Sequence, residues 1–251
     1  MNKSKEEIQK ICSRFEFIEN IDSNDIELKN VINNRNNFKP FEKPDAIYIS
    51  EGNDIINIYG IEHFQISLYK NIRKKGDISK IALGSQGNRK MLKEDKTYDY
   101  QPSVCNLIDS LKRNLETHSK SFEEYKNHTT KEYNCNYEKY KLIIFIEDSS
   151  DPGYIVKDKT SELICPLKIR QFVDQLLKYK DWIWAVIYTT GIDETKTITG
   201  YTLGELEKRY DDLIDIKSCR PFETERVVFV SKNDDGNDSN EITINLNDHI
   251  F

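Results

Sequence analysis

Two short runs of almost wholly apolar residues limit the fold of this chain more than any other feature. They are KLIIFIED at 141–148 and DWIWAVIYT at 181–189. Apolar runs of this length are typical of central strands that are covered on both faces. The segment 166–179 between them places Phe172 and Leu176 on one side of a helix. The sequence therefore predicts a strand, helix, strand unit, and with it an α/β fold.

The rest of the chain adds helices and strands to this unit. Apolar spacing predicts helices over 5–18 and 25–34, and a long helix from Val104 to Tyr125 that lies across a sheet. Strands at 227–231 and 242–246 form an extra C-terminal hairpin. No repeat or low-complexity linker divides the 251 residues. We expect a single domain over 1–251, with a mixed central sheet flanked by helices, a core over about 5–190 and an elaboration over about 191–251.

Charge and cysteine content exclude several classes of protein. Lys and Arg number 37 against 43 Asp and Glu, a net charge of -6, so a nonspecific basic DNA coat is excluded and any nucleic-acid site is a local patch. The five cysteines are scattered without a C-x-x-C pair, which indicates reduced thiols and no zinc knuckle. The start of the chain has no apolar signal core, and the run Leu142–Ile146 is too short to span a bilayer. We expect a cytoplasmic protein.

The segment 44–67 reads as a β-hairpin that carries the most informative residues. With Gly52 and Asn53 as the two turn residues, Asp45 lies opposite Gly60. One face of this hairpin is then apolar except for Asp45 and Glu62. These two residues become diagonal neighbours with backbones about 7 to 8 Å apart, and Gly60 leaves the space between them open.

Two carboxylates beside an apolar face repel each other and lose hydration, so they need protons or a cation. A hard Mg²⁺ ion, or Mn²⁺, accepts carboxylate oxygens at about 2.1 Å and keeps water ligands. Such an ion lowers the pKa of a bound water and stabilises the negative charge on a phosphate during hydrolysis. The pair Asp45 and Glu62 therefore predicts a divalent metal site. The plainer interpretation is a surface hairpin whose two end carboxylates are solvated.

Pro44-Asp45, followed by Glu62 on the next strand within a helix, hairpin, helix, strand order, resembles the PD-(D/E)XK, or restriction-endonuclease-like, nuclease superfamily. The resemblance implies a restriction-endonuclease-like core and a metal-dependent phosphodiesterase. It also implies Asp45 and Glu62 as metal ligands, the carbonyl of His63 as a further oxygen, and a Lys beside the attacking water.

The sequence departs from this family where the Lys is expected, because Phe64 stands two residues after Glu62. Some members supply that Lys from elsewhere. Lys70 has the same strand parity as Glu62 and is the favoured catalytic substitute, and Lys43 is the alternative. His118 interrupts the apolar stripe of the long helix and is interpreted as a packed core residue.

The segment 70–96 offers a second indication of function. It holds nine basic and three acidic residues, a local excess of positive charge in an acidic chain. Phosphate groups are attracted to such a patch, and its glycines permit close approach of the backbone. We interpret it as an exposed mobile loop whose candidate nucleic-acid-binding residues are Arg73, Lys74, Lys75, Arg89 and Lys90. A solvated loop without a ligand is the alternative.

Together these features predict a Mg²⁺-dependent endonuclease that hydrolyses DNA, in preference to RNA, within bacterial or phage defence. Nucleic acid is the expected partner, a homodimer or larger defence complex is an option, and no membrane is involved. The main alternative is a degenerate nuclease-fold module that binds nucleic acid or protein without cleavage. A third option is a structural interaction protein with a Tyr-rich surface.

Overall fold

The computed structural model describes residues 5–16, 18, 21–52, 55–66, 69–71, 76–77, 98–102, 104–134, 139–148, 165–190, 198–215, 225–229 and 242–246. The helices are α1 (Lys5–Glu16), α2 (Ile26–Asn33), α5 (Val104–His118), α6 (Phe122–Glu132), α7 (Arg170–Leu177) and α8 (Leu203–Lys208). The strands are β1 (Lys39–Pro40), β2 (Ala46–Gly52), β3 (Ile55–Ile66), β4 (Tyr69–Asn71), β5 (Gly76–Asp77), β6 (Tyr98–Pro102), β7 (Tyr140–Asp148), β8 (Ile183–Thr190), β9 (Ile198–Thr202), β10 (Glu225–Phe229) and β11 (Ile242–Leu246).

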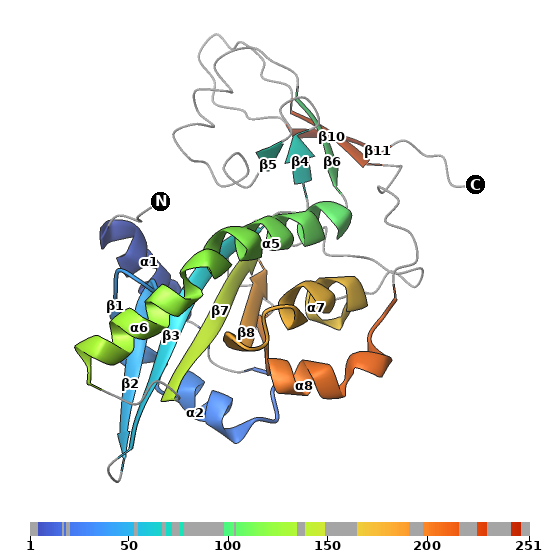
Figure 1. The fold of residues 1–251 in the computed structure, drawn as a ribbon. Helices are drawn as coiled ribbons and strands as arrows, with labels where there is room; N and C mark the ends of the chain where they lie inside the picture. The colour runs from blue at the N-terminus through green and yellow to red at the C-terminus, as the bar shows by residue number, and fades with distance from the viewer. Residues whose placement is uncertain are drawn as a thin grey trace.

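The main sheet has six strands in the order β1-β2-β3-β7-β8-β9 (Figure 1). Strands β3, β7 and β8 are parallel, whereas β2 and β9 pair antiparallel with their neighbours. The sheet is therefore mixed, as the sequence predicts. Because β2 runs against β3, its first residue Ala46 pairs with Ile61 in the middle of β3, and Ile61 in turn pairs with Ile143 in β7. The candidate site lies at this point of the sheet.

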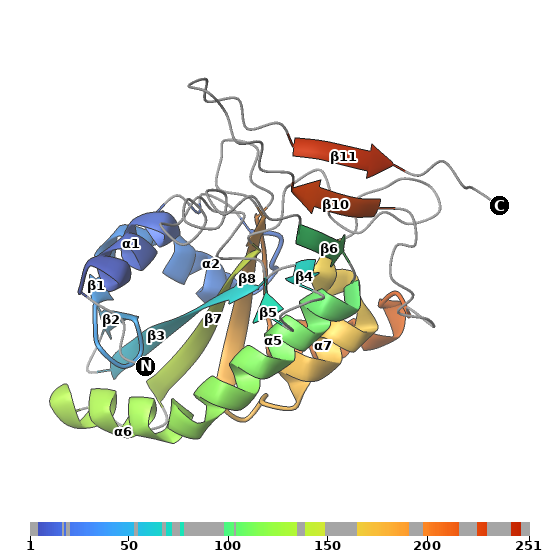
Figure 2. The same ribbon diagram turned by 90° about the horizontal axis from the view of Figure 1, so that it is seen from above.

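Helices cover both faces of the main sheet (Figure 2). Helices α1 and α2 pack with residues such as Ile61 and Phe145 on one face. Helices α5, α6, α7 and α8 pack with Phe64, Ile144 and Val186 on the other. The alternation of Phe145 with Ile144 along β7 sends neighbouring side chains into two separate cores, which explains why this strand is apolar throughout.

Local sequence signals fix several helix ends. Asp25 caps α2 by accepting a hydrogen bond of 2.9 Å from the Leu28 N–H. Thr202 and Glu205 form a capping box at the start of α8. The expected long helix is present as α5 and α6, joined by a short 3₁₀ turn at Ser119–Ser121. Strand β9 and helix α8, which belong to the predicted elaboration, complete the main sheet and its core.

A second sheet holds five strands in the order β11-β10-β6-β4-β5. Its β10 and β11 form the predicted C-terminal hairpin, although β10 covers 225–229 rather than 227–231. Strands β4 and β5 lie within the segment 70–96 that was expected to be a loop, so that expectation is wrong for Lys70–Asn71 and Gly76–Asp77. Short polar strands of this kind lack the apolar alternation that would mark them in the sequence.

Among the described cysteines, one departs from expectation. Cys12 and Cys165 are free thiols. Cys105, the second residue of α5, is disulfide-bonded, so the prediction of reduced thiols is wrong there. The side-chain pattern of the sequence carries no signal for this bond, because cysteine spacing alone does not determine connectivity.

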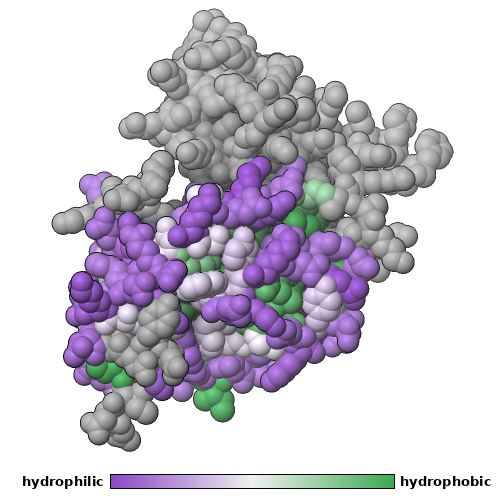
Figure 3. Space-filling view, viewed as in Figure 1, coloured by the Kyte–Doolittle hydropathy of each residue, from purple (hydrophilic) through white to green (hydrophobic). Residues whose placement is uncertain are grey.

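Hydrophilic residues dominate the face of the molecule shown in Figure 3, with smaller hydrophobic areas between them. Within the described part of the chain, no helix has both the length and the apolar character that a membrane span requires.

Candidate active site

The register of the β2–β3 hairpin differs from the predicted one by two residues. Gly52 pairs with Ile55 and Ile47 pairs with Gly60, so continuing the ladder past Ala46 places Asp45 directly opposite Glu62 rather than opposite Gly60. Because the shift is an even number of residues, every side chain stays on its predicted face. On the continued register the two carboxylates are cross-strand neighbours rather than diagonal ones.

Asp45 and Glu62 are buried, with 4% and 3% of their surface exposed. The carboxylate of Asp45 accepts a hydrogen bond of 2.8 Å from the backbone N–H of His63. This bond holds the residue before β2 against β3 and orients its carboxylate. Since the N–H and C=O of one residue in a strand point to the same side, the His63 carbonyl also faces the β2 side of β3.

Two tyrosines lie close to this acidic pair. Burial raises the pKa of the Tyr125 hydroxyl, and the negative charges of Glu62 and then Asp45 raise it further. Burial also raises the pKa of Tyr140 well above its ordinary value, with a further contribution from Glu62. Both hydroxyls therefore stay protonated at neutral pH. Both carboxylates therefore act on the same tyrosine of α6.

Gly60 makes room for this arrangement. A Cβ atom at position 60 would clash with the hydroxyl of Tyr140 and lie 2.7 Å from Cγ of Pro44. Within the described residues, the buried Tyr140 hydroxyl has no hydrogen-bond partner. An unsatisfied hydroxyl of this kind is costly in a core, and it lies beside Glu62.

His118 is the basic group that meets Glu62. Its Nδ1 atom lies 2.5 Å from Oε1 of Glu62, and its side chain is 26% exposed. The interpretation of His118 as a purely packed core residue is therefore wrong. The signal available in the sequence was the position of a polar imidazole inside an apolar stripe, on the helix that covers the face bearing Glu62.

The predicted alternative lysine, Lys43, points elsewhere. Its Nζ atom lies 2.9 Å from Oε1 of Glu124 on the exposed side of α6. Phe41 packs against the ring of His128 with 5.4 Å between centroids. These two contacts hold the loop that precedes Asp45 against α6.

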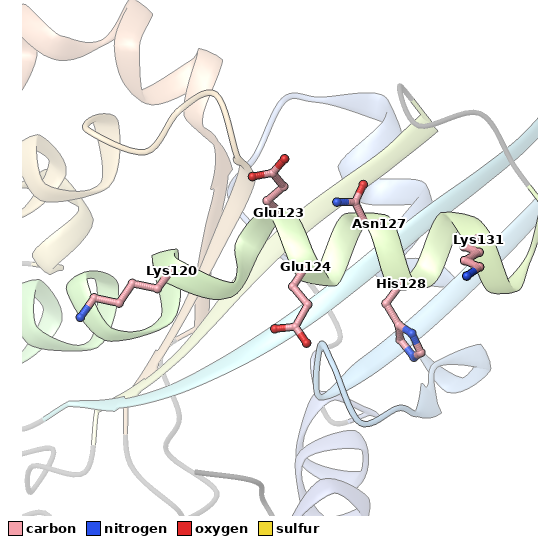
Figure 4. Close-up of a pocket in the computed structure, with 6 residues that line it drawn as sticks. All are labelled: Lys120, Glu123, Glu124, Asn127, His128 and Lys131. Atoms are coloured by element: carbon pink, nitrogen blue, oxygen red, sulfur yellow. The ribbon is translucent and has the colours of Figure 1, made fainter.

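A shallow pocket runs along this exposed side of α6 (Figure 4). It is lined by Lys120, Glu123, Glu124, Asn127, His128 and Lys131. Its two lysines are matched by two glutamates, so the pocket does not favour a polyanion such as nucleic acid.

A second polar group lies on the opposite face of the sheet. The Nε2 atom of His63 lies 3.0 Å from Oε2 of Glu147, and both side chains are buried. The amide of Gln65 donates a long hydrogen bond of 3.5 Å to the same carboxylate oxygen. Because Glu62 and His63 are consecutive on β3, they point to opposite faces, so Glu147 does not join the acidic pair.

The remaining predicted site residues lie away from the main sheet or outside the described residues. Lys70 lies in β4, where it pairs with Asp77 and Gln101 in the second sheet. Its catalytic role stays a prediction. Arg73, Lys74, Lys75, Arg89 and Lys90 lie outside the residues that the structure describes.

The donor set suits a hard divalent cation. The described residues contain no group of three or more His, Cys, Asp and Glu side chains arranged to hold a metal ion. Mg²⁺, however, is usually bound through one or two carboxylates, with water and phosphate oxygens as its other ligands. Asp45 and Glu62 meet this requirement, because they are adjacent, buried and on one face.

Comparison with protein-family models, curated proteins and solved structures finds no match to this chain.

Proposed function

We propose that this protein is a metal-dependent phosphodiesterase that hydrolyses nucleic acid, with Asp45 and Glu62 as ligands of a Mg²⁺ or Mn²⁺ ion. The observation that carries the proposal is that two carboxylates are buried together: Asp45 precedes the last pair of the ladder, Ala46 and Ile61, and is hydrogen-bonded to the residue after Glu62. Two like charges held together in a poorly solvated place are unfavourable unless a cation or a proton compensates them.

The residues around the acidic pair have defined parts in this proposal. The His63 N–H orients Asp45, and the His63 carbonyl is a further oxygen on the same side of β3. The Tyr125 hydroxyl hydrogen-bonds with Glu62, whereas the buried Tyr140 hydroxyl has no hydrogen-bond partner among the described residues. When bound, the divalent ion supplies charge neutralisation at the phosphate and a water of lowered pKa.

The order of elements supports a restriction-endonuclease-like core as the finer description of this fold. Helix α1 precedes the hairpin of β2 and β3, and α5 and α6 follow it before β7 joins parallel to β3. The excess of basic residues over 70–96 supports a polyanionic substrate. We favour DNA over RNA as that substrate. Lys70, the lysine expected near the attacking water, belongs to β4 of the second sheet, and its part in catalysis stays a prediction.

A second candidate, a module that binds nucleic acid or protein without cleavage, is favoured by one observation. Phe64 occupies the position where the PD-(D/E)XK resemblance implies a Lys, and it is 1% exposed within the core. A core phenylalanine cannot serve as a basic group. This candidate predicts salt-dependent binding to DNA that is unaffected by Mg²⁺ and by changes at Asp45 or Glu62.

Cleavage assays separate the two candidates. Plasmid DNA, single-stranded DNA and RNA are incubated with the full chain in Mg²⁺, in Mn²⁺ and in a chelator. Asp45→Asn and Glu62→Gln keep the size of each side chain and remove its charge. We expect each to reduce kcat/KM by about 100-fold or more, because the loss of a ligand exceeds the 10 to 100-fold typical of residues behind a ligand.

Glu51→Gln is the matched control, because Glu51 is an exposed carboxylate on β2 of the same hairpin. It should cleave at the wild-type rate. Cleavage that persists in Asp45→Asn and Glu62→Gln would refute the proposed site. Salt-dependent binding with no cleavage under any condition would support the binding module instead.

A further inference from the structure

We propose that His118 is the positioning residue for Glu62, and that it fills from helix α5 the place beside the acidic pair where a Lys at position 64 is missing. This inference rests on the proposed function, because Glu62 has to act as a metal ligand for its positioning to affect cleavage.

The contact between the two side chains is short and shielded. The Nδ1 atom of His118 lies 2.5 Å from Oε1 of Glu62, whose side chain is only 4% exposed. A hydrogen bond that involves a charged group in a poorly solvated place is stronger than one in water. One carboxylate oxygen of Glu62 is therefore held by α5, and this fixes the orientation of the whole group.

Phe64 packs against the imidazole of His118 and so helps to orient it toward Glu62. It lies two residues after Glu62 on β3, so both side chains project from the same face. Its ring centroid lies 4.9 Å from that of His118, with the two planes tilted by 49°. The aromatic residue at the Lys position thus packs against the basic group that contacts Glu62. We infer that Phe64 and His118 together replace a single lysine.

The two lysines considered from the sequence are placed less well for this role. Lys43 is ion-paired with Glu124 at 2.9 Å. Lys70 belongs to the second sheet, whereas His118 ends the helix that covers Glu62. Partners that orient a ligating group affect metal affinity or activity by 10 to 100-fold. His118 is in direct contact with its target and therefore meets the requirement for such a partner.

Four variants and three measurements test this role. His118→Ala removes the contact, and His118→Asn restores an amide nitrogen close to the position of Nδ1. Phe64→Lys combined with His118→Ala returns a lysine to the position next to Glu62. Lys112→Ala is the control, because Lys112 is an exposed residue on the same helix α5 whose ion-pair partner is Glu116. Mn²⁺ affinity is measured by titration, kcat and KM by DNA cleavage, and folding by circular dichroism.

We expect His118→Ala to lower both kcat and Mn²⁺ affinity by about 10 to 100-fold with little change in KM. His118→Asn should recover part of the loss, which a merely space-filling histidine would not predict. Phe64→Lys in the His118→Ala background should also recover activity. If this double variant does not fold, the Asn variant decides the question. Lys112→Ala should match the wild type.

The inference and the proposed function fail in different ways. Wild-type kcat and Mn²⁺ affinity in His118→Ala, together with an inactive Asp45→Asn, would overturn the role of His118 and leave the proposed function standing. Full activity in Asp45→Asn and Glu62→Gln, or no Mn²⁺ binding by the wild type, would overturn both.

Discussion

The carboxylate of Asp45 accepts a hydrogen bond of 2.8 Å from the backbone N–H of His63, which ties the start of one strand to its neighbour. The contribution of this hydrogen bond to stability can be measured separately from the contribution of the negative charge. Asp45→Asn retains a carbonyl acceptor, whereas Asp45→Ala leaves a buried N–H without this partner. We expect the alanine variant to be less stable than the asparagine variant by about 1 to 3 kcal/mol. Equal midpoints in urea denaturation would show that the bond does not stabilise the fold.

Gly60 should tolerate no larger residue. Gly60→Ala places a methyl group against the hydroxyl of Tyr140 and 2.7 Å from Cγ of Pro44, and overpacking of this kind costs about 1 to 3 kcal/mol of the free energy of unfolding. Adding Tyr140→Phe removes one of the two clashing groups, so the double variant should regain part of the lost stability.

Gly204→Ala is the matched control for Gly60, because Gly204 lies in α8 with no other group within 4 Å of a Cβ placed there. Alanine is favoured over glycine in a helix, and this variant should be more stable than the wild type by about 0.5 to 1 kcal/mol. Thermal denaturation measures both substitutions. A Gly60→Ala protein as stable as the wild type would contradict the close packing of Pro44, Gly60 and Tyr140.

Glu205 should contribute to stability in a pH-dependent way. Burial alone would raise the pKa of its carboxyl, but hydrogen bonds from Ser23 at 2.6 Å, from the Thr202 N–H and from the Asn24 N–H outweigh burial and lower that pKa below its ordinary 4.5. A carboxyl whose pKa is lower in the folded chain stabilises the fold above its ordinary pKa. That contribution is lost as the pH falls from about 4.5 through the lower, folded value.

Glu205→Gln should therefore be less stable than the wild type by about 0.5 to 1.5 kcal/mol near neutral pH, with a difference that shrinks in acid. Glu207→Gln is its control, because Glu207 forms an exposed ion pair with Lys180. A surface pair of this kind contributes at most about 1 kcal/mol. Urea denaturation at a series of pH values checks both, and a Glu205→Gln deficit that is constant with pH would contradict the assignment.

The sequence predicted the parts of the fold that depend on apolar periodicity. Strand β7, helix α5 and helix α7 lie where their patterns place them, because each buries a continuous apolar face. The predicted register of the hairpin is wrong by two residues, because the ladder ends at the pair Gly52 and Ile55 rather than at Glu51 and Asp54. The face of Asp45 and Glu62 was nevertheless right, because side-chain alternation is unchanged by an even shift.

Contacts between distant parts of the chain could not be predicted in the same way. Apolar periodicity predicts which side of the helix carries His118. It does not predict that His118 contacts Glu62 on β3, because that contact depends on how α5 packs across the sheet. The pairing of Lys43 with Glu124 and the strands of the second sheet have the same limitation. Short polar strands and surface ion pairs are set by tertiary contacts and not by local pattern.

The most direct test of the central claim is a titration of the full chain with Mn²⁺, followed by electron paramagnetic resonance or calorimetry. If Asp45 and Glu62 hold one divalent ion between them, the wild type and Glu51→Gln bind it equally. Asp45→Asn and Glu62→Gln should each then bind it at least about 10-fold more weakly. Mn²⁺ affinity that is the same in the wild type and in a protein carrying both Asp45→Asn and Glu62→Gln would contradict the account.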